Sequence, residues 1–202
     1  MRADDNLWRC NAAPFMSARF EVFDTPLQRV KRIQRKRIGD TRGYFERLFC
    51  TEDLGGLIFG KNIVQINHTL TDKRGTARGL HYQYPPHAET KIISCLRGEI
   101  FDVAVDIRRN SPTFLHWYGE ILSDENGQSL LIPEGYAHGF QTLTESCELI
   151  YLHTAAYCSN AEGALNVLDP RLNIAWPLPI EVLSERDRSH PFLGPDFVGI
   201  AL

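Results

Sequence analysis

The segment Ile100-Phe-Asp-Val-Ala-Val-Asp-Ile107 determines the fold class that this sequence predicts. Its side chains alternate, and one of its two faces is entirely apolar because it carries Phe101, Val103, Val105 and Ile107. A period of two residues is typical of a β-strand that buries one face. The preceding segment, Lys91-Ile-Ile-Ser-Cys-Leu96, is a second predicted strand, and the turn Arg97-Gly98-Glu99 separates the two.

Further predicted strands lie on both sides of this pair, at residues 62–67, 117–122, 129–132 and 148–153. Asn126-Gly127 lies between the second and third of these, and this dipeptide between two strands predicts a β-hairpin. Only two short helices are indicated, one that opens at Thr51 and stops at Gly55-Gly56, and one that starts at Ser184. Strands spaced by about 8–12 residues favour an all-β sandwich or barrel.

Length and composition indicate one globular domain. The chain has 202 residues, a formal net charge of −3 and a hydrophobic fraction of 43%, which is enough for a single core. No stretch approaches the ~18 apolar residues of a membrane span. Residues 1–16 contain acidic residues and no apolar run of the signal-peptide kind. We therefore expect a cytoplasmic protein without a membrane partner, with residues 1–16 as an N-terminal extension and residues 17–202 as the domain.

Two other features exclude common classes of site. The cysteines form no CxxC pair and predict reduced thiols rather than a disulfide framework or a zinc site; they are Cys10, Cys50, Cys95, Cys147 and Cys158. The basic run from Arg29 to Arg37 is interrupted by Val30 and Ile33 and contains no aromatic residue for base stacking. It predicts a solvated strand face or an anion-facing edge rather than a nucleic acid partner.

Two segments contain histidines beside other reactive side chains: Arg78-Gly-Leu-His-Tyr-Gln83 and Pro133-Glu-Gly-Tyr-Ala-His138. A lone histidine is most often structural, but these lie on strands that would line one barrel mouth together with lysine, arginine and tyrosine. The second segment fits the Pro-x-Gly-x-x-His signature of the cupin barrels, many of which bind a metal ion. The first cupin signature requires His-x-His, whereas this chain has His81-Tyr82-Gln83. Because a metal site needs at least three ligands, the sequence predicts a pocket without metal or other cofactor.

Taken together, the motifs resemble the dTDP-4-dehydrorhamnose 3,5-epimerase family, a metal-free branch of the cupins. The resemblance extends from about Phe20 to Leu193 and rests on Gly39–Gly43, Gln65–Thr69, Arg78–Gln83, Gly98–Arg108, Ser111–Phe114, Ile132–Phe140, Asp169-Pro170, Trp176-Pro177 and Leu183–Asp187. It implies a cupin-like jelly-roll barrel with a few short peripheral helices. It also implies a homodimeric isomerase of deoxysugar or polysaccharide biosynthesis.

The resemblance further implies a reaction, the epimerisation at C3 and C5 of a nucleotide-linked 4-keto-6-deoxyhexose such as dTDP-4-dehydro-6-deoxyglucose. Removal of the proton on the carbon next to the ketone would form an enolate. His81 would be the base, with Asp187 on its other ring nitrogen. Tyr151 would return a proton from the opposite face, and Lys91 would stabilise the enolate.

The same resemblance implies a set of substrate-binding residues, namely Arg42, Gln65, Asn67, Arg78, His138, Glu162 and Arg186. The chain departs from the family in one place, because Arg47 stands where the family usually has a glutamate near the nucleotide. Glu46 would face the other way along the strand. We include Arg47 among the expected contacts and leave the nucleotide base and the sugar configuration open.

Three alternatives remain at this level. A C3-only epimerase or a ketoisomerase would use the same base and a shared enolate. A catalytically silent cupin would bind a nucleotide sugar without proton exchange.

Overall fold

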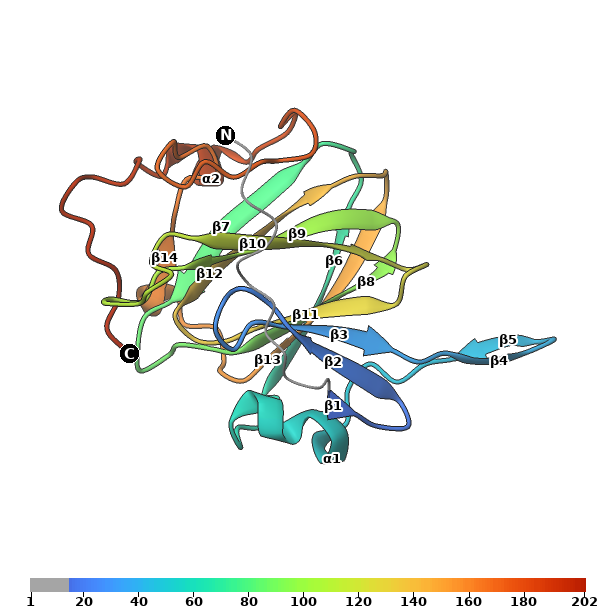
Figure 1. Cartoon of the computed structure of the whole chain (residues 1–202). Coiled ribbons are helices and arrows are strands. Elements are labelled where there is room, and N and C mark those ends of the chain that lie inside the picture. The colour runs from blue at the N-terminus through green and yellow to red at the C-terminus, as the bar shows by residue number, and fades with distance from the viewer. Residues whose placement is uncertain (1–14) are drawn as a thin grey trace.

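The computed structural model describes residues 15–202, in which two antiparallel β-sheets face each other (Figure 1). The seven-stranded sheet consists, in spatial order, of β1 (Phe15–Met16), β2 (Phe20–Asp24), β3 (Lys31–Arg35), β11 (Gln128–Ile132), β8 (Lys91–Arg97), β13 (Cys147–His153) and β6 (Gln65–Thr71). The five-stranded sheet consists of β10 (Trp117–Ser123), β9 (Glu99–Asp106), β12 (Tyr136–Thr142), β7 (Ala77–Gln83) and β14 (Glu162–Ala164). The predicted all-β jelly-roll architecture is confirmed.

The remaining elements are short and peripheral. They are the ribbon of β4 (Ile38–Asp40) and β5 (Gly43–Phe45), the helices α1 (Thr51–Leu54) and α2 (Glu185–Ser189), and the 3-10 turns η1 (Gly55–Ile58) and η2 (Ser159–Ala161). Both predicted helices exist. Ser184 caps α2 by accepting a hydrogen bond from the Asp187 backbone N–H at 3.0 Å. Gly55-Gly56 does not end the first helical segment but turns it into η1.

The prediction of a β-hairpin at Asn126-Gly127 is wrong. The turn exists, and the Asn126 Oδ1 accepts the backbone N–H groups of Ser123 and Gln128 at 3.1 and 2.9 Å. However, β10 pairs with β9, whereas β11 pairs with β3 and β8. The chain therefore crosses from one sheet to the other at this turn, because the long-range partners of β11 lie in the opposite sheet.

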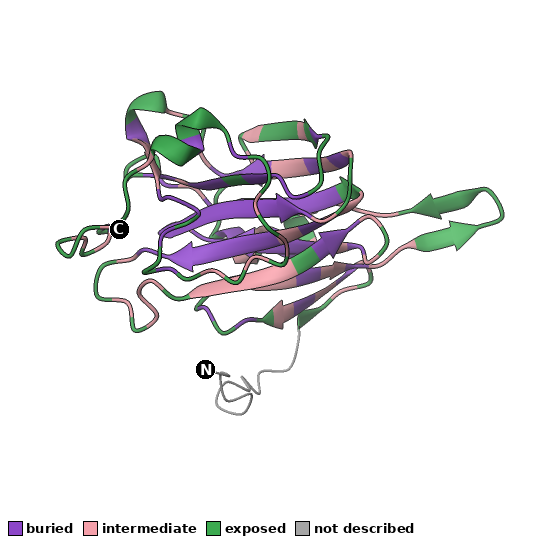
Figure 2. Ribbon diagram, turned by 90° about the horizontal axis from the view of Figure 1, so that it is seen from above, coloured by how far each residue is buried: buried purple, intermediate pink, exposed green. Residues whose placement is uncertain are grey.

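Three apolar clusters hold the layers together, and buried residues are concentrated on the strands of the two sheets (Figure 2). The first lies between the sheets and includes Ile93 and Leu149 from one sheet and Ala104 and Phe140 from the other. The second lies on the outer face of the five-stranded sheet and is covered by residues between 165 and 200. The third lies outside the seven-stranded sheet, under α1 and η1. The apolar face predicted from the segment 100–107 belongs mainly to the second cluster.

The ribbon β4–β5 stands out from the body of the molecule (Figure 1). Its apolar side chains Ile38, Tyr44 and Phe45 are each more than half exposed. The basic run at its base is only partly the solvated face that the sequence predicts. Arg35 is buried, and its guanidinium contacts Glu46 Oε2 at 3.1 Å and Ser129 Oγ at 2.5 Å.

The predicted N-terminal extension lies almost wholly outside the described residues, as does Cys10. Phe15 and Met16 pair with β2. The other four cysteines are free thiols. No helix within residues 15–202 combines the length and apolar character needed to cross a bilayer.

Candidate active site

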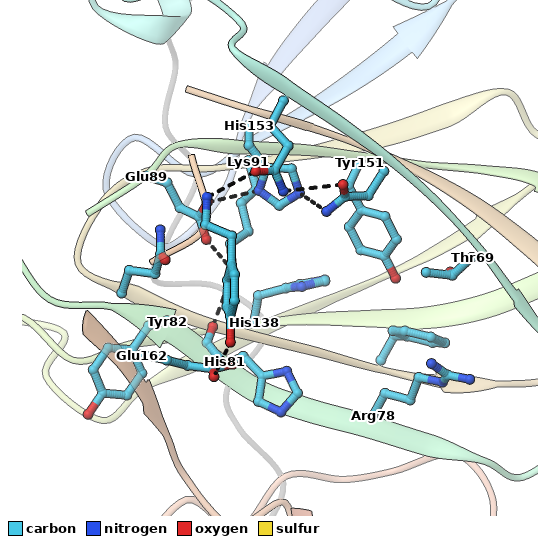
Figure 3. A pocket seen from close by; sticks show the side chains of 15 residues that line it. Thr69, Arg78, His81, Tyr82, Glu89, Lys91, His138, Tyr151, His153 and Glu162 are labelled. Atoms are coloured by element: carbon cyan, nitrogen blue, oxygen red, sulfur yellow. Dashed lines mark hydrogen bonds and ion pairs between the residues drawn. The ribbon is translucent and has the colours of Figure 1, made fainter. Parts of the chain in front are cut away.

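One cavity of about 270 Å³ opens between the two sheets and receives side chains from both (Figure 3). The five-stranded sheet contributes Arg78, His81, Tyr82, Gln83, His138, Phe140 and Glu162. The seven-stranded sheet contributes Gln65, Asn67, Thr69, Lys91, Tyr151 and His153, and Glu89 and Tyr157 lie in adjoining loops. Residues far apart in the sequence therefore meet in one polar site.

His81 on β7 is paired with a buried carboxylate. Its Nε2 atom lies 2.7 Å from Oδ1 of Asp187, which projects from α2 and is 3% exposed. Burial alone would raise the pKa of Asp187, but the hydrogen bond and charge of His81 and the Gly79 N–H outweigh it and lower that pKa. An ionised Asp187 holds the ring in place and leaves Nδ1 to accept a proton.

A close approach of two strands places His81 opposite His138. These residues are cross-strand partners on β7 and β12, beside a register shift. A Cβ atom on Gly79, whose φ is +128°, would lie 2.5 Å from the Cα of Gly139. Only glycine permits this contact, which brings the two histidine-bearing strands together.

His138 forms a second imidazole–carboxylate pair. Its Nε2 atom lies 2.7 Å from Oδ1 of Asp102 on the neighbouring strand β9. Both residues are buried. The pair fixes the orientation of the His138 ring, whose edge faces Tyr151 with the ring centroids 6.0 Å apart.

Tyr151 on β13 enters the cavity from the opposite sheet. Its ring packs beside those of His138 and His153, and the His153 ring is nearly parallel to it with the centroids 6.1 Å apart. Burial raises the pKa of the Tyr151 phenol well above its ordinary value. The hydroxyl therefore stays protonated at neutral pH and can donate a proton or a hydrogen bond.

Lys91 begins β8, lines the cavity and is 7% exposed. Its Nζ atom lies 3.0 Å from Oε1 of Glu89 and 3.3 Å from the carbonyl oxygen of His81. The other oxygen of Glu89 lies 2.9 Å from Nδ1 of His153. The buried ammonium thus has a partner on each side.

The cavity is lined by most of the predicted substrate contacts. Gln65, Asn67 and Arg78 line it directly. Glu162 also lines it and pairs with Arg186 from α2. Burial would raise the pKa of Glu162, but the hydrogen bonds from Arg186 and Tyr157 lower it.

Arg42 and Arg47 are not brought to the cavity of their own chain. Arg42 lies in the ribbon β4–β5 with its side chain 87% exposed, paired with Asp40 at 2.5 Å. Arg47 lies 3.7 Å from Asp53 of α1. Glu46 faces the other way and pairs with Arg37, at 3.2 Å, as well as with Arg35.

The possible metal ligands within residues 15–202 form one close group, His81, Asp187 and His190. Two of its members are already joined by the 2.7 Å hydrogen bond described above. His138, the second histidine considered for a metal, pairs instead with Asp102.

Sequence reasoning did not name several polar members of the site, among them Asp102, Glu89, His153 and Tyr157. Asp102 could have been found, because a carboxylate in the middle of a strand predicted to be buried needs a partner. Glu89, His153 and Tyr157 gave no local signal. His153 meets this site through the pairing of β13 with β8, which sets it opposite Lys91.

Comparisons with known proteins agree on one family. The family model described as dTDP-4-dehydrorhamnose 3,5-epimerase matches residues 24–194. The dTDP-4-dehydrorhamnose 3,5-epimerase of Sinorhizobium fredii is 42% identical over 165 residues, which are 81% of this chain and 85% of the relative.

Solved structures are similar over a comparable length. The dTDP-6-deoxy-D-glucose-3,5-epimerase of Legionella pneumophila, in complex with dTDP-4-keto-L-rhamnose, is 39% identical with a TM-score of 0.81, covering 86% of this chain and 92% of that one. A 3′-monoepimerase from Streptomyces bikiniensis, in complex with dTDP-quinovose, is 33% identical with a TM-score of 0.75, covering 81% and 83%.

Proposed function

The chain belongs to the dTDP-4-dehydrorhamnose 3,5-epimerase family, and from this premise we propose how its own residues carry out the reaction. It is an isomerase that epimerises a dTDP-linked 4-keto-6-deoxy sugar at C3 and C5. The observation that carries the assignment of roles is that an imidazole paired with a carboxylate and a protonated phenol enter one cavity from opposite sheets.

His81 is the base in this proposal. Its Nδ1 takes the proton from the carbon beside the ketone, and the electron pair of the broken C–H bond moves onto the C4 oxygen. Asp187 stabilises the imidazolium that forms, because it is ionised and bound to Nε2. The Lys91 ammonium stabilises the enolate oxygen, and preorganised charge of this kind contributes about 3 kcal/mol per donor.

Tyr151 completes the inversion by giving its hydroxyl proton to the opposite face of the same carbon. The imidazolium then loses its proton, and the phenolate regains one through solvent. The same pair of groups serves both carbons, because C3 and C5 flank one ketone and share the enolate oxygen.

The substrate is held in two parts. A cavity of about 270 Å³ is close to the lower limit of ~300–1,000 Å³ for small-molecule sites, so it encloses the sugar and leaves the nucleotide at its mouth. Arg78 and Arg186 suit the diphosphate, because a guanidinium can bind two phosphate oxygens at once. Gln65, Asn67, His138 and Glu162 contact the remaining polar groups.

We also propose a homodimer in which the ribbon β4–β5 of one copy packs against the other. The ribbon supplies Arg42, and the segment that follows it supplies Arg47, to the cavity of that other copy. The exposed Ile38, Tyr44 and Phe45 support this, since exposed apolar side chains gathered on a projecting ribbon favour association. A cytoplasmic location belongs to the same proposal and is supported by the free thiols at four cysteines.

Proton exchange in deuterated water tests the function. The expected result is deuterium at C3 and C5 of dTDP-4-dehydro-6-deoxyglucose, with inversion at both carbons, seen by NMR and mass spectrometry. Label at C3 alone would identify a C3-only epimerase, and a moved carbonyl a ketoisomerase. Binding without any exchange would refute catalysis, and a parallel panel of GDP- and CDP-linked sugars tests the nucleotide.

A further inference from the structure

A chain of hydrogen bonds runs along one wall of the cavity and links three residues that the proposed function places against the substrate (Figure 3). It starts at the Lys91 ammonium, passes through Glu89 and His153, and continues through the side chains of Asn67 and Gln65. It ends at the backbone N–H of Tyr157, which donates to Gln65 Oε1 at 2.9 Å. Glu89 and His153 have no role in the proposed proton transfers by His81 and Tyr151.

Both ends of this chain have a fixed polarity. A backbone N–H only donates, so Gln65 must turn its oxygen toward Tyr157 and its nitrogen toward Asn67. The Gln65 Nε2 lies 3.2 Å from Asn67 Oδ1 and donates to it. The Asn67 nitrogen is then left to face Nε2 of His153, at 3.3 Å.

This order determines the protonation of His153. An amide nitrogen can only donate, so Nε2 of His153 must accept and cannot carry a proton. The proton of the neutral ring is on Nδ1, which donates to Glu89 Oε2 at 2.9 Å. The Lys91 ammonium donates to the other oxygen.

Glu89 is therefore the acceptor at which donors from two directions meet. Burial would raise its pKa, but the hydrogen bond from His153 and the charge of Lys91 outweigh burial and lower it. An ionised carboxylate has no proton to donate and can accept from both neighbours. Its two acceptor oxygens allow the order set at the Tyr157 N–H to continue to His153, while Lys91 donates from the other side.

The same order of hydrogen bonds determines which atoms of Gln65 and Asn67 are free to bind the substrate. Among residues 15–202, the Gln65 Nε2 and the Asn67 Nδ2 each have one hydrogen-bond partner, although each carries two hydrogens. Their oxygens each already accept one bond, from the Tyr157 N–H and from Gln65 Nε2. These two residues line the cavity and present N–H donors, which suit the oxygens of an anionic nucleotide sugar.

We propose that Glu89 and His153 are positioning residues, which fix the carboxamides of Asn67 and Gln65 as donors toward the substrate and hold Lys91 in place. The kinetic part of this proposal rests on the proposed function. The protonation state of His153 does not.

Glu89→Gln tests the proposal with almost no change in volume. An amide has one oxygen and one NH2 group, so it cannot accept from both Lys91 and His153. If its oxygen stays on Lys91, its NH2 group faces Nδ1 of His153, and the ring proton must move to Nε2. Asn67 and Gln65 must then turn over, and Gln65 loses its bond to the Tyr157 N–H.

The first readout is the ¹⁵N NMR spectrum of protein labelled at histidine, with His153→Asn used to assign the His153 signals. We expect a neutral ring protonated at Nδ1 in the parent and at Nε2 in Glu89→Gln. A parent ring protonated at Nε2, or the same tautomer in both proteins, would overturn the proposal. If Glu89→Gln does not fold, Asn67→Asp replaces it, because a carboxylate beside Nε2 should make the ring doubly protonated.

The second readout separates positioning from a merely structural role. We expect KM for the nucleotide sugar to rise about tenfold in Glu89→Gln, as for the loss of one hydrogen bond to a charged group, while kcat falls by less. Glu148→Gln is the matched control, because Glu148 on β13 also pairs with a histidine, His68 at 3.2 Å, but outside the cavity. Its KM should equal that of the parent.

An unchanged KM in Glu89→Gln together with a lower melting temperature would show a structural role and refute positioning. Failure of the parent to exchange substrate protons would instead refute the proposed function. The tautomer of His153 would still decide whether the hydrogen-bond order exists.

Discussion

The Nε2 atom of His81 lies 2.7 Å from Oδ1 of Asp187, so only Nδ1 of that ring is left to take a proton from a substrate. The relationship joins β7, the fourth of the five strands in its sheet, to a five-residue helix more than 100 positions later in the chain. The orientation and the tautomer of the proposed base therefore depend on Asp187.

Asp187→Asn should lower kcat by about 10²–10³-fold with little change in KM, since the amide neither stabilises the imidazolium nor fixes the same tautomer. Steady-state kinetics measures both constants. Glu185→Gln, on the exposed side of the same helix, is the control and should match the parent. An Asp187→Asn enzyme with parental kcat would remove Asp187 from the mechanism.

Tyr151→Phe should separate exchange from inversion. His81 can still remove a proton and return it, so deuterium should enter the substrate, but the opposite face has lost its donor. The ratio of inverted product to exchanged substrate, measured by NMR, should fall at least ~10²-fold. Tyr118→Phe, a phenol outside the cavity, is the control. Equal loss of exchange and inversion would contradict the role of acid.

Lys91→Met should reduce kcat by about 10²–10³-fold, because the enolate loses its preorganised positive charge. Lys61→Met removes a lysine that pairs with Glu134 away from the cavity and should leave kcat unchanged. If Lys91→Met raises KM and leaves kcat intact, Lys91 binds the ground state only.

Mixing two inactive variants tests whether the ribbon β4–β5 places Arg42 in the cavity of the partner subunit. If Arg42 acts in the partner's cavity, a mixed dimer of Arg42→Ala and His81→Ala contains one site with neither substitution, and activity should reappear on mixing. Each variant alone serves as the blank. If Arg42 acts within its own chain, every site in the mixture carries a substitution and activity stays absent.

Asp106 should make stability depend on pH. It accepts from Arg108 Nη2 at 2.7 Å, Ser111 Oγ at 2.5 Å and Thr113 Oγ1 at 2.6 Å. Burial would raise the pKa of Asp106, but these bonds outweigh burial and lower it. Its contribution is therefore complete above the unfolded pKa of ~3.9 and is lost as pH falls through the lower folded pKa.

Asp106→Asn should cost at least ~2 kcal/mol of unfolding free energy at pH 7, and the difference from the parent should shrink below about pH 4. Urea unfolding at both pH values measures it. A difference that is constant down to pH 2 would mean that the Asp106 charge makes no contribution.

The sequence predicted most of the architecture because the strands carry local patterns. The alternation in residues 100–107 and the cap at Ser184 depend on near neighbours alone. The turn at Asn126-Gly127 shows the limit. Its local chemistry is that of a tight turn, but β11 pairs with β3 and β8, which lie about 95 and 35 residues away in the chain.

The same limit applies to the site. The resemblance indicated His81, Lys91, Tyr151 and Asp187, and all four lie in or behind one cavity. Glu89 and His153 could not be inferred, because they meet only through the register of two strands. Arg42 and Arg47 could be named from motifs, but a single chain does not bring them to the cavity.

The two groups proposed to handle protons, His81 and Tyr151, are attached to different sheets, so the gap between them is a property of the core. Side chains such as Ala104 and Ile93 separate the layers, and stacked sheets lie about 10 Å apart. A bulkier or smaller residue there would widen or narrow the slot for the sugar ring without touching the substrate. Stereochemical fidelity, meaning how often removal of a proton ends in inversion, should therefore be sensitive to the volume of buried residues that take no part in the chemistry.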